Sequence, residues 1–141
     1  MKTIIITAII SLMAPTMALA QSPEFTPEQR AEGEAQIKAT GKRLADTLKD
    51  SESAKFRNVF IRKTKGQDGI EHISLCGEIN AKNSYGAMTG WALVAGDAVS
   101  VYVGNSGIIN ANLICGERRG VFDTRDYAPE LKAAVLANAG V

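Results

Sequence analysis

The chain has two cysteines, Cys76 and Cys115, and each begins a Cys-Gly-Glu tripeptide. The carboxylates that follow, Glu78 and Glu117, could divide the roles of general acid and general base if they were held close together. On antiparallel strands that meet at the two cysteines, however, the glutamates would lie about 13 Å apart. We therefore expect structural or solvent-facing carboxylates, with hydrolysis of cell-wall glycan or peptide through this pair as the enzymatic alternative.

The single histidine offers little for a nucleophilic or metal site. His72 precedes Cys76 by four residues in a segment that reads as a strand, which separates the two by about 13 Å. One histidine and two cysteines that are expected to be oxidised do not make a tetrahedral metal shell. The sequence also lacks a glycine-rich phosphate loop and a Gly-x-Ser-x-Gly elbow. We predict an exposed or half-buried strand histidine, no metal and no cofactor.

A polar segment that follows Cys76 is the best candidate for a binding site. Its hydrogen-bonding and aromatic side chains are Asn80, Lys82, Asn83, Ser84, Tyr85 and Trp91. The aromatic residues could anchor a recognition loop over residues 80–85, with Glu78 at its rim. Alternatively, asparagine and serine side chains satisfy their own backbone in tight turns, and the aromatic rings pack beneath them. Both interpretations stay open at the level of sequence.

The amino-terminal segment, residues 1–20, has the pattern of an export signal. Lys2 supplies a positive start, residues 4–13 are almost continuously apolar, and Ala18-Leu19-Ala20 fits a signal-peptidase site. A retained membrane anchor is the alternative, but the apolar run is shorter than the roughly 20 residues that cross a bilayer. We expect a mature chain of residues 21–141 that forms one domain, without stable membrane insertion after cleavage.

Charge excludes one class of partner. The chain carries sixteen basic and fifteen acidic residues, and without Lys2 the mature part is formally neutral, with the signs interspersed. A nucleic-acid-binding protein would show a basic patch, so we predict no nucleic acid and instead an unidentified protein or envelope ligand.

An exported chain with two cysteines favours a disulfide between Cys76 and Cys115, in a bacterial periplasm or outside the cell. Closing this loop would stabilise the fold by about 4 kcal/mol on the chain-entropy estimate. The alternative is a pair of buried free thiols.

Helices are expected at both ends of the mature chain. Thr26-Pro27-Glu28-Gln29 combines a hydroxyl cap, a proline in the first turn and a glutamine that can reach back to the cap, so a helix should run to about Leu48. Within it, Gly41 is a candidate for close approach to a sheet. Asp126 is placed to cap a second, short helix over residues 129–138.

Strands are expected between the helices, over residues 56–64, 70–79, 88–94, 98–103 and 108–115. Because they follow one another without crossover segments, the pattern predicts an α+β fold, with the first helix packed on an antiparallel sheet of four or five strands.

Residues 53–59 (SAKFRNV) and 76–86 (CGEINAKNSYG) resemble a small, uncharacterised domain that recurs in exported bacterial proteins and in some phage-associated ones. In similar sequences a glycine and an aromatic residue stand where this chain has Ala87 and Met88. The resemblance covers about a third of the chain, implies a bacterial setting and names no activity.

Together, these features favour a small exported binding or accessory module. A wall hydrolase that uses Glu78 and Glu117 is one alternative. The other is a structural envelope component that assembles through the apolar strand edge at residues 99–103.

Overall fold

One antiparallel sheet of five strands, in the order β4-β3-β2-β1-β5, organises the chain. The computed structural model describes residues 25–105, 110–116 and 120–140, so the expected signal peptide and Glu117 lie outside the described residues. The elements in chain order are α1 (Pro27–Thr47), β1 (Lys55–Lys65), β2 (Glu71–Asn80), β3 (Ala92–Gly96), β4 (Val101–Val103), α2 (Ala111–Cys115), β5 (Val121–Phe122) and α3 (Ala128–Asn138). The predicted α+β class is confirmed.

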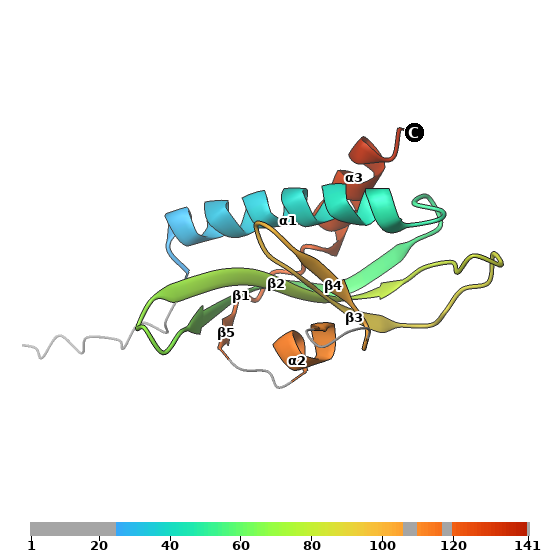
Figure 1. Ribbon diagram of the computed structural model, residues 1–141. Helices are drawn as coiled ribbons and strands as arrows, with labels where there is room; N and C mark the ends of the chain where they lie inside the picture. Colours follow the sequence, from blue (N-terminus) through green and yellow to red (C-terminus); the bar gives the residue numbers. More distant parts are fainter. Residues whose placement is uncertain (1–24, 106–109, 117–119, 141) are drawn as a thin grey trace, which may run out of the picture.

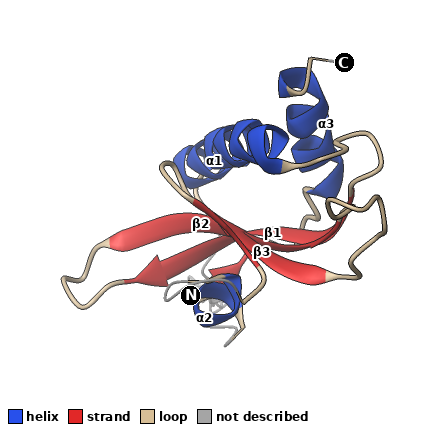
Figure 2. Ribbon diagram, turned by 45° about the vertical axis from the view of Figure 1, so that its right-hand side comes forward, coloured by secondary structure: helices blue, strands red, loops and turns tan. Residues whose placement is uncertain are grey.

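The two long helices cover one face of the sheet and the short helix α2 lies against the other (Figures 1 and 2). The main core lies between the sheet and the long helices. Its fully buried aliphatic side chains are Ile37, Leu44, Val59, Ile61, Leu75, Val94, Leu131 and Val135. Burial of each such side chain contributes about 1.5–3 kcal/mol, so this helix-covered face holds most of the stability.

Helix α1 begins with the predicted capping box. The Thr26 hydroxyl accepts the Gln29 amide at 3.2 Å, and the Gln29 side chain accepts the Thr26 amide at 3.1 Å. The helix ends beside Leu48, as expected. Of its glycines, Gly33 lies against Ile61 of the sheet, whereas Gly41 lies against Ala134 of α3. The close approach predicted at Gly41 is therefore to a helix, not to the sheet.

A bulge interrupts the pairing of β1 with β2 between Arg57 and Phe60, and Asn58 takes a left-handed backbone with φ of 52°. Asparagine tolerates this conformation better than most residues. The Asp126 carboxylate supports the bulge by accepting the amides of Asn58 (3.2 Å) and Val59 (2.9 Å). It also accepts the amide of Ala128, the first residue of α3. Asp126 therefore joins the bulge to the start of α3, although the N-cap position itself is Tyr127.

The strand predicted over residues 108–115 is wrong, because Ala111–Cys115 is a helix. The Asn110 side chain accepts the Leu113 amide at 3.1 Å, which is an N-cap contact that an apolar pattern does not reveal.

Two other strands begin later than predicted. Met88 makes only an isolated bridge to Lys82, and β3 starts at Ala92, after Gly90 with φ of 85°. Strand β4 starts at Val101, because the Asp97 side chain holds the preceding turn.

Within the described ranges, no helix is long and apolar enough to span a bilayer.

Candidate binding face

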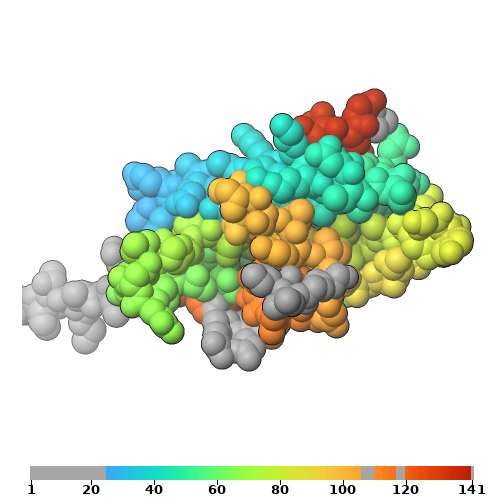
Figure 3. Space-filling view, in the orientation of Figure 1, coloured from blue at the N-terminus to red at the C-terminus, as the bar shows by residue number. Residues whose placement is uncertain are grey.

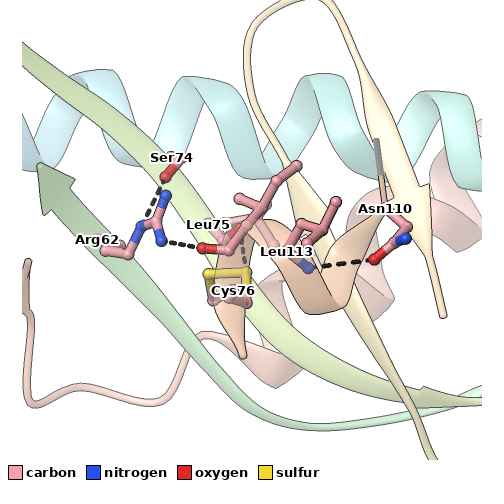
Figure 4. The surroundings of a disulfide bond; sticks show 8 residues. Arg62, Ser74, Leu75, Cys76, Asn110 and Leu113 are labelled. Carbon is pink, nitrogen blue, oxygen red and sulfur yellow. Dashed lines mark hydrogen bonds between the residues drawn. A yellow bond between two sulfur atoms is a disulfide. The ribbon is translucent and has the colours of Figure 1, made fainter. Parts of the chain in front are cut away.

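The disulfide fixes α2 against the sheet face opposite the long helices. Cys76 of β2 and Cys115 of α2 are bonded, with their Cα atoms 5.8 Å apart, so the predicted pairing is confirmed. Arg62 of β1 donates to the Ser74 hydroxyl at 3.3 Å and to the Ile114 carbonyl in α2 (Figure 4). Burial lowers the pKa of the Arg62 guanidinium from its ordinary value. A five-residue helix is too short to be stable alone, so these contacts hold it.

Beside α2 the same sheet face is hollowed, and we call this hollow with its lining the open face. Its volume is about 750 Å³. The lining comes from β1, β2, β3, β5, the disulfide and the segment after β5, and comprises Asn58, Phe60, Cys76, Gly77, Glu78, Leu93, Cys115, Phe122, Asp123 and Thr124. Sites for small ligands have volumes of about 300–1,000 Å³ and combine an apolar lining with a few polar groups. The open face has both properties.

Glu78 is the most tightly held polar group of the open face. Its carboxylate accepts the Arg57 side chain twice, at 3.0 and 3.1 Å, and the Asn58 side-chain amide at 2.7 Å. The hydrogen bonds from Arg57, and then those from Asn58, lower the pKa of Glu78 from its ordinary value of 4.5. The side chain is therefore ionised at neutral pH, where it can accept hydrogen bonds but is a poor proton donor.

Arg57 also connects Glu78 to Trp91. The guanidinium carbon lies 4.0 Å from the centre of the indole, a favourable cation–π distance. Trp91 keeps 39% of its surface exposed. A connected group of charged, amide and aromatic side chains thus stands at the rim of the open face.

Asp123, at the edge of the open face, is buried and already engaged. Its carboxylate accepts the Tyr127 hydroxyl at 2.9 Å and lies 3.8 Å from the Arg30 guanidinium. Burial, reinforced by Asp123, raises the pKa of Tyr127 to about 12. The hydrogen bond between Tyr127 and Asp123 therefore fixes the segment after β5. The Tyr127 hydroxyl keeps its proton at physiological pH.

In the predicted binding loop, residues 80–85, two asparagine side chains support the turn. The Asn83 side chain accepts the amides of Tyr85 (2.9 Å) and Ala87 (3.1 Å), and the Asn80 side chain accepts the amide of Gly90 (3.1 Å). These contacts satisfy backbone donors that the turn would otherwise leave without partners. The side-chain oxygens of the two asparagines therefore help to shape the loop.

The remaining polar residues of the loop separate into two groups. Lys82 forms an ion pair with Asp50 at 2.5 Å, which ties the loop to the α1–β1 connection. The connection from β2 to β3, residues 81–91, projects as an arm that is yellow-green in Figure 1 and yellow in Figure 3. Ser84 and Tyr85 are the turn residues at its tip, and Tyr85 is 95% exposed. Tyr85 therefore does not anchor the loop by packing beneath it. Of the six predicted binding residues, Trp91 is the one that Arg57 connects to the open face.

The other predicted chemical residues are not brought together. Glu117 lies outside the described residues, so its distance from Glu78 is not defined. His72 is exposed on β2, with Nε2 3.9 Å from the Asp68 carboxylate. Among the residues that the structure describes, no group of three or more histidine, cysteine or acidic side chains is arranged to hold a metal ion.

Seven of the ten lining residues were absent from the sequence-based candidates, and so was Arg57 at the rim. The seven are Asn58, Phe60, Gly77, Leu93, Phe122, Asp123 and Thr124. A signal for one of them exists, because Val59, Phe60 and Ile61 are consecutively apolar. Successive side chains of a strand point to opposite faces, so such a run implies an apolar group on the second face. The position of the bulge, which places Arg57 and Asn58 beside Glu78, has no comparable signal.

Comparisons with protein families, with curated proteins and with solved structures found no match to this chain.

Proposed function

We propose that the chain is an exported bacterial binding or accessory module that takes its ligand on the open face. The observation that carries the proposal is the hollow of about 750 Å³ beside the disulfide. On the opposite face, α1 and α3 pack over the main core and leave a smaller hollow of about 360 Å³. Apolar rings that stay partly exposed next to fixed polar groups are what a ligand site requires.

The chemistry of the lining indicates the kind of ligand. Phe60, Leu93 and Phe122 offer apolar surface, and Glu78 offers carboxylate oxygens that hydroxyl or amide hydrogens can reach. The Arg57–Glu78 pair is neutral as a unit, so a strongly charged ligand gains little. A peptide or glycan fragment of the bacterial envelope, with apolar faces and many neutral donors, fits these properties.

Export of the chain is part of the same proposal. A disulfide is the covalent feature expected of a protein that matures in the periplasm or outside the cell. The signal-like pattern of residues 1–20 supports this placement from the sequence side. The resemblance of residues 53–59 and 76–86 to a domain of exported bacterial proteins supports it further.

Titration calorimetry of the mature protein with soluble peptidoglycan fragments tests the proposal. Leu93→Gln places an amide in the apolar lining and should weaken binding by about tenfold or more. The control, Ile70→Gln, changes an apolar residue that is 58% exposed at the β1–β2 turn, and should bind as the wild type does. Tyr85→Ala, at the tip of the arm, should also bind normally.

Three outcomes would contradict this assignment. Absence of binding to any fragment would remove the envelope ligand. Loss of binding in Tyr85→Ala with normal binding in Leu93→Gln would move the site to the loop. Cleavage of the fragments, detected by mass spectrometry and abolished in Glu78→Gln, would indicate the hydrolase instead.

A further inference from the structure

The two edges of the sheet differ in whether other segments form backbone hydrogen bonds to them. On the β1 side, the amide of Asp123 donates to Ile61 at 2.9 Å and that of Tyr127 donates to Val59 at 2.7 Å. The Asp126 carboxylate takes two further amides of that edge. The residues from β5 to Tyr127 thus cover the outer edge of β1. On the other side, β4 is the outermost strand among the residues that the structure describes.

Hydrogen bonding alternates along β4, so the backbone groups of every second residue point away from β3. The amide of Gly104 donates to Leu93 at 2.8 Å, and Tyr102 pairs with Ala95 in the same register. In an antiparallel ladder, residues that exchange hydrogen bonds with the neighbour alternate with residues that do not. Gly104 and Tyr102 therefore face β3, and the backbone groups of Val101 and Val103 face outward.

The side chains of β4 divide between the two faces. Val101 and Val103 line a second hollow with Leu44 of α1 and with Leu48, which follows the helix, on the helix-covered face. Tyr102 packs against the cluster that contains the disulfide, on the opposite face. Val103 is 40% exposed, and Val99, in the turn before β4, is 77% exposed. The edge therefore presents a β-branched row on one face and a tyrosine on the other.

The sequence of this edge contains no charged side chain that would oppose pairing with another strand. Residues 98–105 (AVSVYVGN) contain no charged residue and no proline. Natural edge strands are commonly protected by lysine, by proline or by a bulge, and the register of β4 with β3 is regular. A second copy of the same segment would bring no like charges together and would oppose valine to valine.

We propose that β4 pairs with β4 of a second copy of this chain, antiparallel and about a two-fold axis at Tyr102. In this register Val101 lies opposite Val103 of the second copy, and these are the residues whose backbone groups point outward. Each such pair exchanges two hydrogen bonds, so the contact has about four. The two Tyr102 rings become direct cross-strand neighbours, an arrangement favourable for aromatic residues.

Because β4 has only three residues, the association is expected to be weak and to depend on protein concentration. Sedimentation of the mature protein between about 10 μM and about 1 mM should show the mass rising toward twice that of one chain. Val103→Lys should raise the dissociation constant by about tenfold or more, because two lysines enter the contact. Ile70→Lys, which adds the same charge at the β1–β2 turn, should associate as the wild type does.

A charge-swap experiment tests the register and guards against unfolding of a single variant. Val101→Lys and Val103→Glu should each be monomeric alone, whereas their mixture should form a one-to-one dimer through the apposed lysine and glutamate. A monomeric wild type at about 1 mM, or equal association of Val103→Lys and wild type, would overturn the proposal. An associating wild type with a monomeric mixture would overturn it as well, because the register would be wrong.

Discussion

The Cys76–Cys115 disulfide allows a quantitative prediction about stability. Replacing both cysteines with alanine opens a loop whose ends are 39 residues apart in sequence. The chain-entropy estimate for this separation is about 4 kcal/mol, and typical domains have only about 5–15 kcal/mol in total. Urea denaturation of the oxidised wild type and of the double variant should therefore show a fall of about 3–5 kcal/mol in the free energy of unfolding.

The same substitution should have a local effect on α2. Without the disulfide, the five-residue helix keeps the Arg62 contact to Ile114 and the packing of Ala111, which we expect to be insufficient to hold it. Amide exchange of residues 111–115 should become fast while that of α1 stays slow. Wild type reduced with dithiothreitol is the control and should match the double variant. A loss below about 1 kcal/mol, or protected amides in α2, would refute the reasoning.

Three further predictions concern single residues. The Lys132 ammonium donates to the carbonyls of Ser51, Glu52 and Ala54. Lys132→Met should therefore lower the free energy of unfolding, measured by urea titration, by about 2 kcal/mol. An unchanged urea midpoint would contradict this prediction. Because the folded-state pKa of Glu78 is below 4.5, its carboxylate stabilises the fold above that pH, and this contribution is lost as the pH falls through the folded-state value. The stability difference between wild type and Glu78→Gln should thus be largest near neutral pH and shrink below pH 4.5, and a difference independent of pH would show that the ion pair is irrelevant. A Cβ added at Gly33 would lie 2.4–2.8 Å from side-chain atoms of Ile61. Gly33→Ala should therefore lower the melting temperature, although alanine favours helix more than glycine does. A higher melting temperature would contradict this prediction.

Local patterns predicted those parts of the fold that depend on neighbouring residues. The capping box at Thr26 and Gln29 is such a case, because both partners lie within one turn of helix. The pairing of β1 with β2 is another, since a short turn joins two apolar runs. The prediction of the disulfide needed only the signal-like pattern of residues 1–20 and the count of cysteines.

Features that depend on distant segments were not predicted. Residues 108–115 are rich in isoleucine and leucine, a composition that predicts a strand. In the structure, Cys115 is bonded to Cys76 on the sheet face opposite the long helices, and it lies in a short helix capped by Asn110. β5 has two residues, too few for any periodic pattern. The bulge at Asn58 is held by Asp126, which lies 68 residues away in sequence, so its effect on Arg57 and Glu78 is invisible locally.

The loop at residues 80–85 illustrates a limit of reading polar residues as ligands. Its composition fits a binding site and a self-satisfied turn equally well, because asparagine serves both. The hydrogen bonds of Asn80 and Asn83 support the structural interpretation for these two residues, because their side-chain oxygens accept the backbone amides of Gly90, Tyr85 and Ala87. For Ser84 and Tyr85, exposed at the tip, recognition stays a prediction.

A titration of isotope-labelled mature protein with soluble peptidoglycan fragments, followed by amide chemical shifts, tests the role of the open face most directly. We predict that the largest shifts fall on the residues that line the hollow, led by Phe60, Glu78, Leu93 and Phe122. Shifts confined to residues 82–88, or a spectrum that no fragment changes, would contradict it.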